Sequence, residues 1–391
     1  MMRMTRPGRL CPLCNGKQQV CFLRRGRTPV CQNVLWATRA EARAQPAGRM
    51  EMALCGECGM VWNRTYDPAL VPYGPGYVNA QTASPAFIRY QTGLVRRLTA
   101  VTRGKPARVL EIGCGDGWLM KELVAASPLI RGFGLDPAYR GPARLAGGRL
   151  RLERRAFSPG GPLPPADMVI CRQVIEHIAD PVAFLRALRQ ALGGRRRPRV
   201  FFETSCLRWI LRRRAVWDFF YEHCVLFSAA TLKRAFAEAG FRPVRTWHDF
   251  GGAYLWIEAE LPAAPAHPRT DVAIPLLVDR YQEGEKQLFA RWRKVLRQGG
   301  GHTALWGAAA KGLTFASLFD PDHRFLDCLV DANPAKQGRY LPLSGHEVIA
   351  PSALSRRGIT QVVVTNPQYL GEIRAAVRRL GLKCPVIGPH S

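Results

Sequence analysis

Tyr221, Glu222 and His223 stand side by side in the segment WDFFYEHCVLF (217–227), among aromatic and aliphatic residues. Titratable side chains are costly to bury in apolar surroundings, so this cluster is either a hydrogen-bonded core feature or a catalytic one. A neutral imidazole with an ordinary pKa of about 6.5 is a suitable general base near neutral pH. As a catalyst, His223 would be oriented or electrostatically assisted by Glu222, and the aromatic neighbours would exclude water.

Two C-x2-C pairs, CPLC (11–14) and CGEC (55–58), have the spacing of paired zinc knuckles. Each turn aims two thiolates at one point, and tetrahedral zinc takes four such ligands. The loop between the pairs contains Cys21 and Cys31 as rival ligands, and reduced cysteines in turns are the alternative. We predict one structural zinc site made by Cys11, Cys14, Cys55 and Cys58.

The segment RVLEIGCGDGWLMKELV (108–124) predicts a strand, a glycine-rich turn and an amphipathic helix. Glycine is required where the backbone approaches a ligand closely, and a helix N-terminus offers free N–H groups. Asp136 ends the next predicted strand, where a carboxylate can accept hydrogen bonds from ribose hydroxyls. We therefore predict a nucleotide-type cofactor site that includes Gly113, Gly115, Gly117 and Asp136.

The segment CRQVIEHI (171–178) lies on a further predicted strand and the loop after it. Glu176 and His177 are interpreted as mainly structural, because they precede a helix (181–192) that Asp180 is expected to cap.

Strands alternate with helices between residues 108 and 241, which predicts a parallel, doubly wound α/β sheet. Ligands of such sheets bind beyond the carboxyl ends of the strands. The stretch LPAAPAHPR (261–269) predicts a linker, and a long helix is expected over 278–298 before a second α/β unit. We therefore divide the chain into an N-terminal module (1–75), a central domain (76–262) and a C-terminal domain (263–391).

The C-terminal unit has its own candidate anion site. In WGAAAKG a predicted strand runs into a helix, which places Lys311 well for a phosphate. Asn333, Lys336 and Tyr340 lie in the loop after the next strand. Lys311 is therefore a candidate anion-binding residue; the alternative is a domain that only packs and dimerises.

The composition of the 391-residue chain is ordinary for a globular protein, with 47% hydrophobic and 22% charged residues, so disorder is not indicated. The net charge of +28 comes mainly from scattered Arg, which indicates anionic small molecules more than nucleic acid. We find no signal peptide and no apolar run of the roughly 18 to 20 residues that span a membrane. Twelve cysteines then argue for thiols or metal rather than disulfides. We expect a cytoplasmic monomer or homodimer.

Glu111, the glycine-rich loop and Asp136 together resemble motif I and the second-strand acid of class I S-adenosylmethionine (SAM) methyltransferases. The two C-x2-C pairs, YGPGYVNAQTASPAF (73–87), WGAAAKG, VDANPAKQGRYLP and VTNPQYLGEI extend the similarity over nearly the whole chain. The chain resembles the zinc-containing SAM-dependent sugar C-methyltransferases. This resemblance implies a Rossmann-like class I SAM-methyltransferase sheet, an N-terminal zinc-binding module and a second Rossmann-like α/β domain. SAM and structural zinc are the cofactors that it implies. It also implies SAM contacts for Cys171 and Gln173, because the strand and loop of CRQVIEHI usually hold SAM-contacting residues in that superfamily.

Described members of that family methylate a carbon of nucleotide-linked 4-keto-deoxysugars, and they carry a Y-x-E-H phrase whose His is the general base. Glu222 and His223 match the phrase, whereas Phe220 stands where the family has Tyr. The resemblance implies that His223 deprotonates a carbon next to a ketone before methyl transfer. Tyr77 or Tyr221 would donate a hydrogen bond to the developing enolate oxygen. The resemblance also implies that the C-terminal domain closes over the acceptor, with Lys311, Asn333, Lys336 and Tyr340 as acceptor-binding residues.

Two other functions remain open. An O- or N-methyltransferase acting on a glycan or natural product would use the same His as its base. A zinc-containing RNA-binding protein would use its knuckles and Arg-rich surface, although no aromatic residues interleave with the basic clusters as a stacking platform requires.

Overall fold

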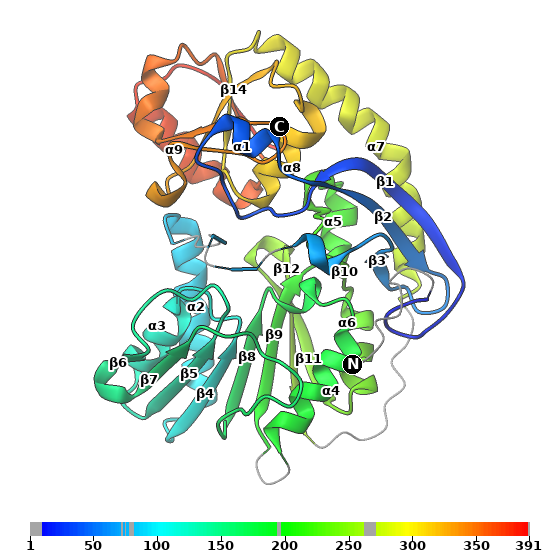
Figure 1. Ribbon diagram of the computed structural model, residues 1–391, viewed down its shortest axis with the longest axis vertical. Coiled ribbons are helices and arrows are strands. Elements are labelled where there is room, and N and C mark those ends of the chain that lie inside the picture. The colour runs from blue at the N-terminus through cyan, green and yellow to red at the C-terminus, as the bar shows by residue number, and fades with distance from the viewer. Residues whose placement is uncertain are drawn as a thin grey trace.

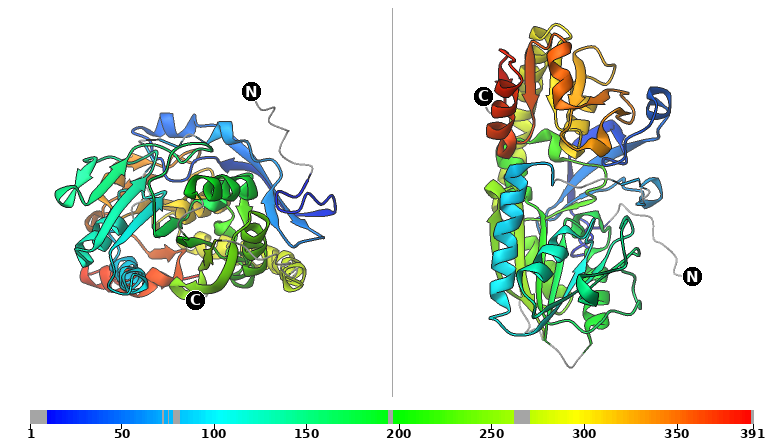
Figure 2. Two further views of the ribbon diagram at one scale, coloured as in Figure 1. Left: turned by 90° about the horizontal axis from the view of Figure 1, so that it is seen from below. Right: turned by 90° about the vertical axis from the view of Figure 1, so that its left-hand side faces the viewer.

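The computed structural model describes residues 10–71, 73–74, 76–77, 82–193, 197–261 and 271–389, and these residues form three β-sheets (Figure 1). Figure 1 shows the central sheet at the lower end of the molecule and the C-terminal sheet at the upper end. The side view in Figure 2 shows the same stacking along the long axis. No helix in the described residues is both long and apolar enough to cross a membrane.

The central sheet has the strand order β11-β12-β9-β8-β4-β5-β7-β6. Strands β9, β8, β4, β5 and β7 are parallel, and β4 has β8 on one side and β5 on the other. The winding therefore reverses at β4, and the loops beyond the carboxyl ends of these strands form the usual ligand-binding edge. The strands are β4 (Ala107–Ile112), β5 (Ile130–Leu135), β6 (Arg144–Leu145), β7 (Leu150–Glu153), β8 (Met168–Arg172), β9 (Arg199–Ser205), β11 (Arg242–Asp249) and β12 (Tyr254–Glu260).

Helices pack on both faces of this sheet, so the predicted doubly wound class I fold is confirmed. Successive residues of β4 point to opposite faces, and Val109 and Leu110 accordingly belong to different core clusters. The predicted helix 181–192 is present with those bounds, and Asp180 caps it by accepting a hydrogen bond from the Ala183 N–H at 2.8 Å. The helices of this part are α2 (Pro85–Val101), α3 (Trp118–Ala126), α4 (Pro181–Leu192), α5 (Leu207–Arg213) and α6 (Ala229–Glu238).

The C-terminal sheet has the order β15-β16-β14-β13-β17-β18, and its central strands are parallel. The long helix begins at Ala273, five residues before the predicted start, and the predicted linker lies outside the described residues apart from Leu261. The elements are α7 (Ala273–Gln298), β13 (Thr303–Trp306), α8 (Ala310–Phe319), β14 (Leu326–Val330), β15 (Arg339–Tyr340), β16 (Glu347–Ile349), β17 (Gln361–Val364), α9 (Leu370–Arg379) and β18 (Val386–Ile387).

The N-terminal sheet is antiparallel and contains a strand from a distant part of the chain. Its order is β1-β2-β3-β10, where β1 is Gln19–Pro29, β2 is Ala47–Cys55 and β3 is Val61–Asn63. The fourth strand, β10 (Val225–Leu226), is the end of WDFFYEHCVLF, and the Asn63 N–H donates to the Cys224 carbonyl at 2.8 Å. The N-terminal module and the candidate catalytic segment therefore share one sheet.

The N-terminal module also contacts the C-terminal part of the chain. Trp36 and Tyr340 exchange two backbone hydrogen bonds, at 3.0 and 2.9 Å. Arg39 of α1 (Arg39–Arg43) lies over the Tyr340 ring, 5.7 Å from its centroid. The module thus joins the two α/β units.

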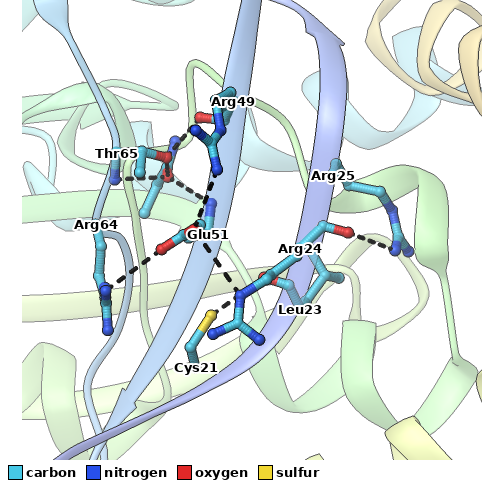
Figure 3. A network of polar contacts seen from close by, with 9 residues as sticks. Cys21, Leu23, Arg24, Arg25, Arg49, Glu51, Arg64 and Thr65 are labelled. Atoms are coloured by element: carbon cyan, nitrogen blue, oxygen red, sulfur yellow. Dashed lines mark hydrogen bonds and ion pairs between the residues drawn. The ribbon is translucent and has the colours of Figure 1, made fainter.

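Arginine side chains surround Glu51 on the N-terminal sheet and form a network of ion pairs (Figure 3). Glu51 of β2 lies 3.8, 3.9 and 3.4 Å from guanidinium nitrogens of Arg24, Arg49 and Arg64. Side chains as exposed as those of Arg24 and Arg49 (68% and 77%) form weak ion pairs. The backbone pairing and the buried residues of the module must therefore supply most of its stability.

The four predicted zinc ligands come together at one end of this sheet. Their sulfurs all lie within 4.8 Å of one another, with Cys11 to Cys58 at 3.5 Å and Cys14 to Cys55 at 3.6 Å. A tetrahedral zinc with bonds of about 2.3 Å needs similar sulfur separations. Cys21 and Cys31 are outside the cluster, and the Cys21 thiol donates to the Leu23 carbonyl instead. The four-cysteine cluster fits zinc.

We predict that the purified protein contains about one zinc per chain and that Cys55→Ser lowers both the zinc content and the melting temperature, because one of four ligands is lost. Elemental analysis and thermal unfolding measure the two effects. Cys21→Ser is the matched control, since this thiol lies in the same module but outside the cluster. Full zinc retention and unchanged melting of Cys55→Ser would refute the site.

Candidate active site

A cavity of about 580 Å³ lies at the carboxyl ends of β4, β5 and β8. Residues from all three predicted cofactor segments line it. They include Glu111, Gly113, Gly115, Asp136 and Gln173.

Backbone conformation at the glycine-rich loop explains its residue types. Gly113 and Gly117 have φ values of 75° and 76°, in the left-handed region that favours glycine. A Cβ on Gly113 would also collide with Val174, and one on Gly117 with Leu152. Gly117 does not line the cavity; its place is at the start of α3.

Asp136 holds the loop in shape as well as facing the cavity. Its Oδ2 accepts a hydrogen bond from the Gly115 N–H at 2.8 Å, and its Oδ1 accepts one from the Ala138 N–H at 2.7 Å. Burial raises the pKa of this carboxyl. Each oxygen keeps a second lone pair, so the carboxylate can still accept from a ligand hydroxyl.

Cys171 is placed differently from the cofactor contact that we predicted. It is fully buried and does not line the cavity. Side chains alternate along a strand, so the next residue of β8, Arg172, faces the cavity instead. Gln173 does line the cavity, with a positive φ of 53°, and its amide donates to Glu203 at 3.1 Å.

Glu222 is the centre of a buried polar network beside the cavity. Its Oε2 accepts a hydrogen bond from the Tyr77 hydroxyl at 2.8 Å and lies 3.4 Å from the Tyr73 hydroxyl. Its Oε1 accepts from the backbone N–H of Gln32, and the Asn33 amide donates to the Tyr77 hydroxyl at 3.0 Å. Burial raises the pKa of Glu222 to about 7.

His177 belongs to this network, which our interpretation of it as a mainly structural residue missed. It lines the cavity, its Nδ1 lies 2.6 Å from the Tyr73 hydroxyl, and the same nitrogen lies 3.7 Å from Glu222. Burial lowers its pKa to about 4. Glu176 is fully buried, and its carboxylate accepts a hydrogen bond from the Ser205 N–H at 3.2 Å. The sequence feature that could have indicated a cavity position for His177 is its place in the same segment, CRQVIEHI, as the predicted cofactor-contacting residue Gln173.

His223 lies behind His177, with ring centroids 4.8 Å apart in an edge-to-face arrangement. The Phe220 ring packs against its other side at 4.7 Å. The imidazole is 8% exposed, and its Nδ1 has no hydrogen-bond partner among the described residues. Burial, together with the nearby His177 and Lys311, holds the pKa of His223 well below its ordinary value, so the ring is neutral at neutral pH.

The two candidate enolate donors have different surroundings. Tyr77 lines the cavity. Tyr221 points into the N-terminal module, where its hydroxyl accepts from the Asp67 N–H at 2.9 Å and its ring packs against Tyr66. The geometry therefore favours Tyr77.

None of the four predicted acceptor residues lines the described cavity. Lys311 pairs with buried Asp218, Lys336 is buried 3.6 Å from Asp331, and the Asn333 side chain accepts from the Ala335 N–H. Tyr340 forms the backbone bridge to Trp36 described above. Each side chain thus already has a contact within the protein.

We predict that Asp136→Ala weakens SAM binding by on the order of 1.5–3 kcal/mol, because hydrogen bonds to a charged acceptor are lost and the Gly115 loop loses its brace. Titration calorimetry measures this change. Asp180→Ala is the control: it removes a helix cap and costs about 1 kcal/mol of stability, but leaves SAM affinity unchanged. Wild-type affinity in Asp136→Ala would mean that the cofactor is held elsewhere.

Comparisons with known proteins agree with this architecture. Residues 87–246 match the family model of a methyltransferase domain, and residues 279–382 match that of a C-methyltransferase C-terminal domain. Ubiquinone biosynthesis O-methyltransferase from Aromatoleum aromaticum is 33% identical over 108 residues, 25% of this chain and 43% of that protein. Trans-aconitate 2-methyltransferase from Methylobacterium nodulans is 33% identical over 101 residues, 25% of this chain and 38% of that protein.

The chain thus spans about two fifths of the length of these curated relatives. Among solved structures, 1,6-didemethyltoxoflavin-N1-methyltransferase from Burkholderia thailandensis, with bound S-adenosylhomocysteine, aligns with a TM-score of 0.36 and 18% identity. The alignment covers 47% of this chain and 82% of that one. By its fold, its cofactor loop and the two family models, the chain carries a methyltransferase domain followed by a C-methyltransferase C-terminal domain.

Proposed function

We propose that this protein is a SAM-dependent methyltransferase that methylates a carbon next to a ketone of a nucleotide-linked deoxysugar. The observation that carries the proposal is the buried pair His177 and His223 beside the cofactor cavity, joined to Glu222 through Tyr73. The match of residues 279–382 to a C-methyltransferase C-terminal domain supports carbon as the methylated atom.

Carbon methylation demands a base within the site. SAM, when bound, supplies an electrophilic methyl group, and a ketone presents a nucleophilic carbon to it only after loss of the adjacent proton. His223 is the proposed base, because burial keeps its imidazole neutral and able to accept a proton. Phe220 on one side of the ring and the buried position limit the access of water.

Proton transfer would create an imidazolium at His223, a charge that burial and the nearby His177 and Lys311 disfavour in the resting site. From His177 the network leads through Tyr73 to the Glu222 carboxylate. Tyr77 lines the cavity and is the proposed hydrogen-bond donor to the enolate oxygen, after rotation of its hydroxyl away from Glu222.

The C-terminal domain is proposed to bind the acceptor because it contacts the catalytic segment. Lys311, at the start of α8, pairs with Asp218 of WDFFYEHCVLF. At a second contact, Glu372 of α9 accepts hydrogen bonds from the Ser84 hydroxyl at 2.7 Å and the Ala86 N–H at 2.9 Å, at the start of α2. A phosphate group of the acceptor would replace Asp218 as the ion-pair partner of Lys311.

Oxygen methylation is the second candidate, because ubiquinone biosynthesis O-methyltransferases are among the curated relatives. A hydroxyl acceptor also benefits from a general base, so the histidines alone do not separate the two reactions. The atom that carries the new methyl group in the product distinguishes the two reactions.

We predict that His223→Ala lowers methyl transfer by on the order of 10²- to 10⁴-fold while SAM affinity stays close to wild type. Mass spectrometry with labelled SAM and a panel of nucleotide-linked ketosugars measures the transfer. With S-adenosylhomocysteine bound, the wild type should exchange the acceptor α-hydrogen with deuterated solvent, and His223→Ala should not.

His302→Ala, at the start of the C-terminal sheet, is the control for a general effect of losing a histidine. Full activity of His223→Ala would show that His223 is a buried core residue without a catalytic role. Lost activity with intact α-exchange would show that His223 positions the acceptor and that another group is the base.

A further inference from the structure

The first turns of α2 and α9 meet where the C-terminal domain contacts the central domain, and Figure 2 shows α9 in red above α2 in cyan. A helix N-terminus carries a partial positive charge, and α2 has no acidic residue in its own first turn. Glu372, in the first turn of α9, supplies a carboxylate at this junction. The C-terminal domain therefore provides the negative charge that the start of α2 lacks.

Glu372 also completes the hydrogen bonding of the first turn of α2. Among the first three residues of this helix only Ala86 and Phe87 have an N–H group, because the first is a proline. The Phe87 N–H donates to the Ser84 hydroxyl at 3.2 Å, and the Ala86 N–H donates to Glu372 at 2.9 Å. The Ser84 hydroxyl in turn donates to the other oxygen of Glu372 at 2.7 Å. Removal of this carboxylate therefore takes a hydrogen-bond partner from both Ala86 and Ser84.

The turn that Glu372 caps carries part of the cavity wall. Phe87 and Gln91 of α2 are buried and line the cavity, as does Thr82, two residues before the cap. The Gln91 side chain also accepts a hydrogen bond from Arg172 of β8 at 3.3 Å. The place of the Phe87 ring at the wall thus depends on the order of the first turn of α2.

A second contact between the same two domains lies beside Phe87. The Phe250 ring packs edge-to-face against Phe87 and also contacts Tyr369, with centroids 5.8 Å apart in each pair. Phe250 has a positive φ of 48°, and a Cβ on Gly251 would collide with the Gln368 side chain. A residue other than glycine keeps such a backbone only where its surroundings impose it. The chain just before α9 therefore packs closely against the support of Phe87.

We infer that Glu372 is a positioning residue of the cofactor cavity, supplied by the C-terminal domain. With its carboxylate in place, the first turn of α2 is already ordered and holds Phe87 at the wall. Without the carboxylate, a ligand must order this turn when it binds, which lowers its apparent affinity. Such coupling is reciprocal, so a ligand in the cavity also stabilises the docking of α9.

This inference rests on the proposed use of SAM, so S-adenosylhomocysteine is the probe. Glu372→Ala should bind it on the order of 3- to 10-fold more weakly than the wild type, as loss of one helix cap predicts. Glu372→Gln should recover part of the affinity, because its amide oxygen still accepts one hydrogen bond. Titration calorimetry measures these affinities. Wild-type affinity in Glu372→Ala would overturn the inference, whereas a wild type that does not bind the probe would contradict the use of SAM itself.

Hydrogen exchange with mass spectrometry separates positioning from a general loss of stability. In Glu372→Ala, peptides that cover the start of α2 should exchange faster, whereas those of β4 and β14 should exchange as in the wild type. S-adenosylhomocysteine should slow exchange at the start of α9 in the wild type and not in the variant. Faster exchange throughout the C-terminal domain would show instead that Glu372 only stabilises that domain.

The matched control is Glu347→Ala, which removes another glutamate of the C-terminal domain. Its ion pair with Arg357 lies within that domain and does not involve α2. This variant should bind S-adenosylhomocysteine as the wild type does. A loss equal to that of Glu372→Ala would mean that any weakening of the C-terminal domain has the same effect, and the specific role of Glu372 would be refuted.

Discussion

The buried carboxyl of Glu222 is the contact on which the proposed site depends. It accepts hydrogen bonds from the Gln32 backbone and from Tyr77, lies 3.4 Å from Tyr73, and precedes the proposed base in the chain. The N-terminal module, the start of the central domain and the catalytic segment thus meet at one residue. Burial of an acid is costly without such partners, so the three parts are required together. The shared sheet of β3 and β10 fixes the same arrangement through the backbone.

Local sequence patterns predicted much of the fold and the cofactor loop. The φ values of the glycine-rich turn, the hydrogen bond from the Ala138 N–H to Asp136 and the Asp180 cap are each set within a few residues of chain, so the residue types indicate them directly. The two C-x2-C pairs were equally informative, because tetrahedral zinc takes four ligands and each pair supplies two thiolates. Short segments of the sequence are therefore enough to predict these features.

The polar network could not be read in the same way, because its members are far apart in sequence. Gln32 and Glu222 are 190 residues apart, and nothing in either segment specifies their meeting. Cys171 illustrates a second limit: a strand sends adjacent side chains to opposite faces, so a shift of one residue exchanges the buried position of Cys171 for the cavity-facing position of Arg172. The contact of His177 with Tyr73 and its place at the cavity could not be predicted, because Tyr73 is 104 residues away in the chain. The C-terminal contacts of Lys311 and Tyr340 likewise depend on the packing of remote segments.

The central claim is that the methyl group is transferred to carbon. It is tested most directly by NMR of the product formed from ¹³C-methyl SAM and a uniformly ¹³C-labelled nucleotide-linked ketosugar. The account predicts a labelled methyl resonance in the C-methyl region, coupled through one bond to a sugar carbon that has lost its α-proton. A labelled methyl in the O-methyl or N-methyl region, without one-bond carbon coupling, would contradict it.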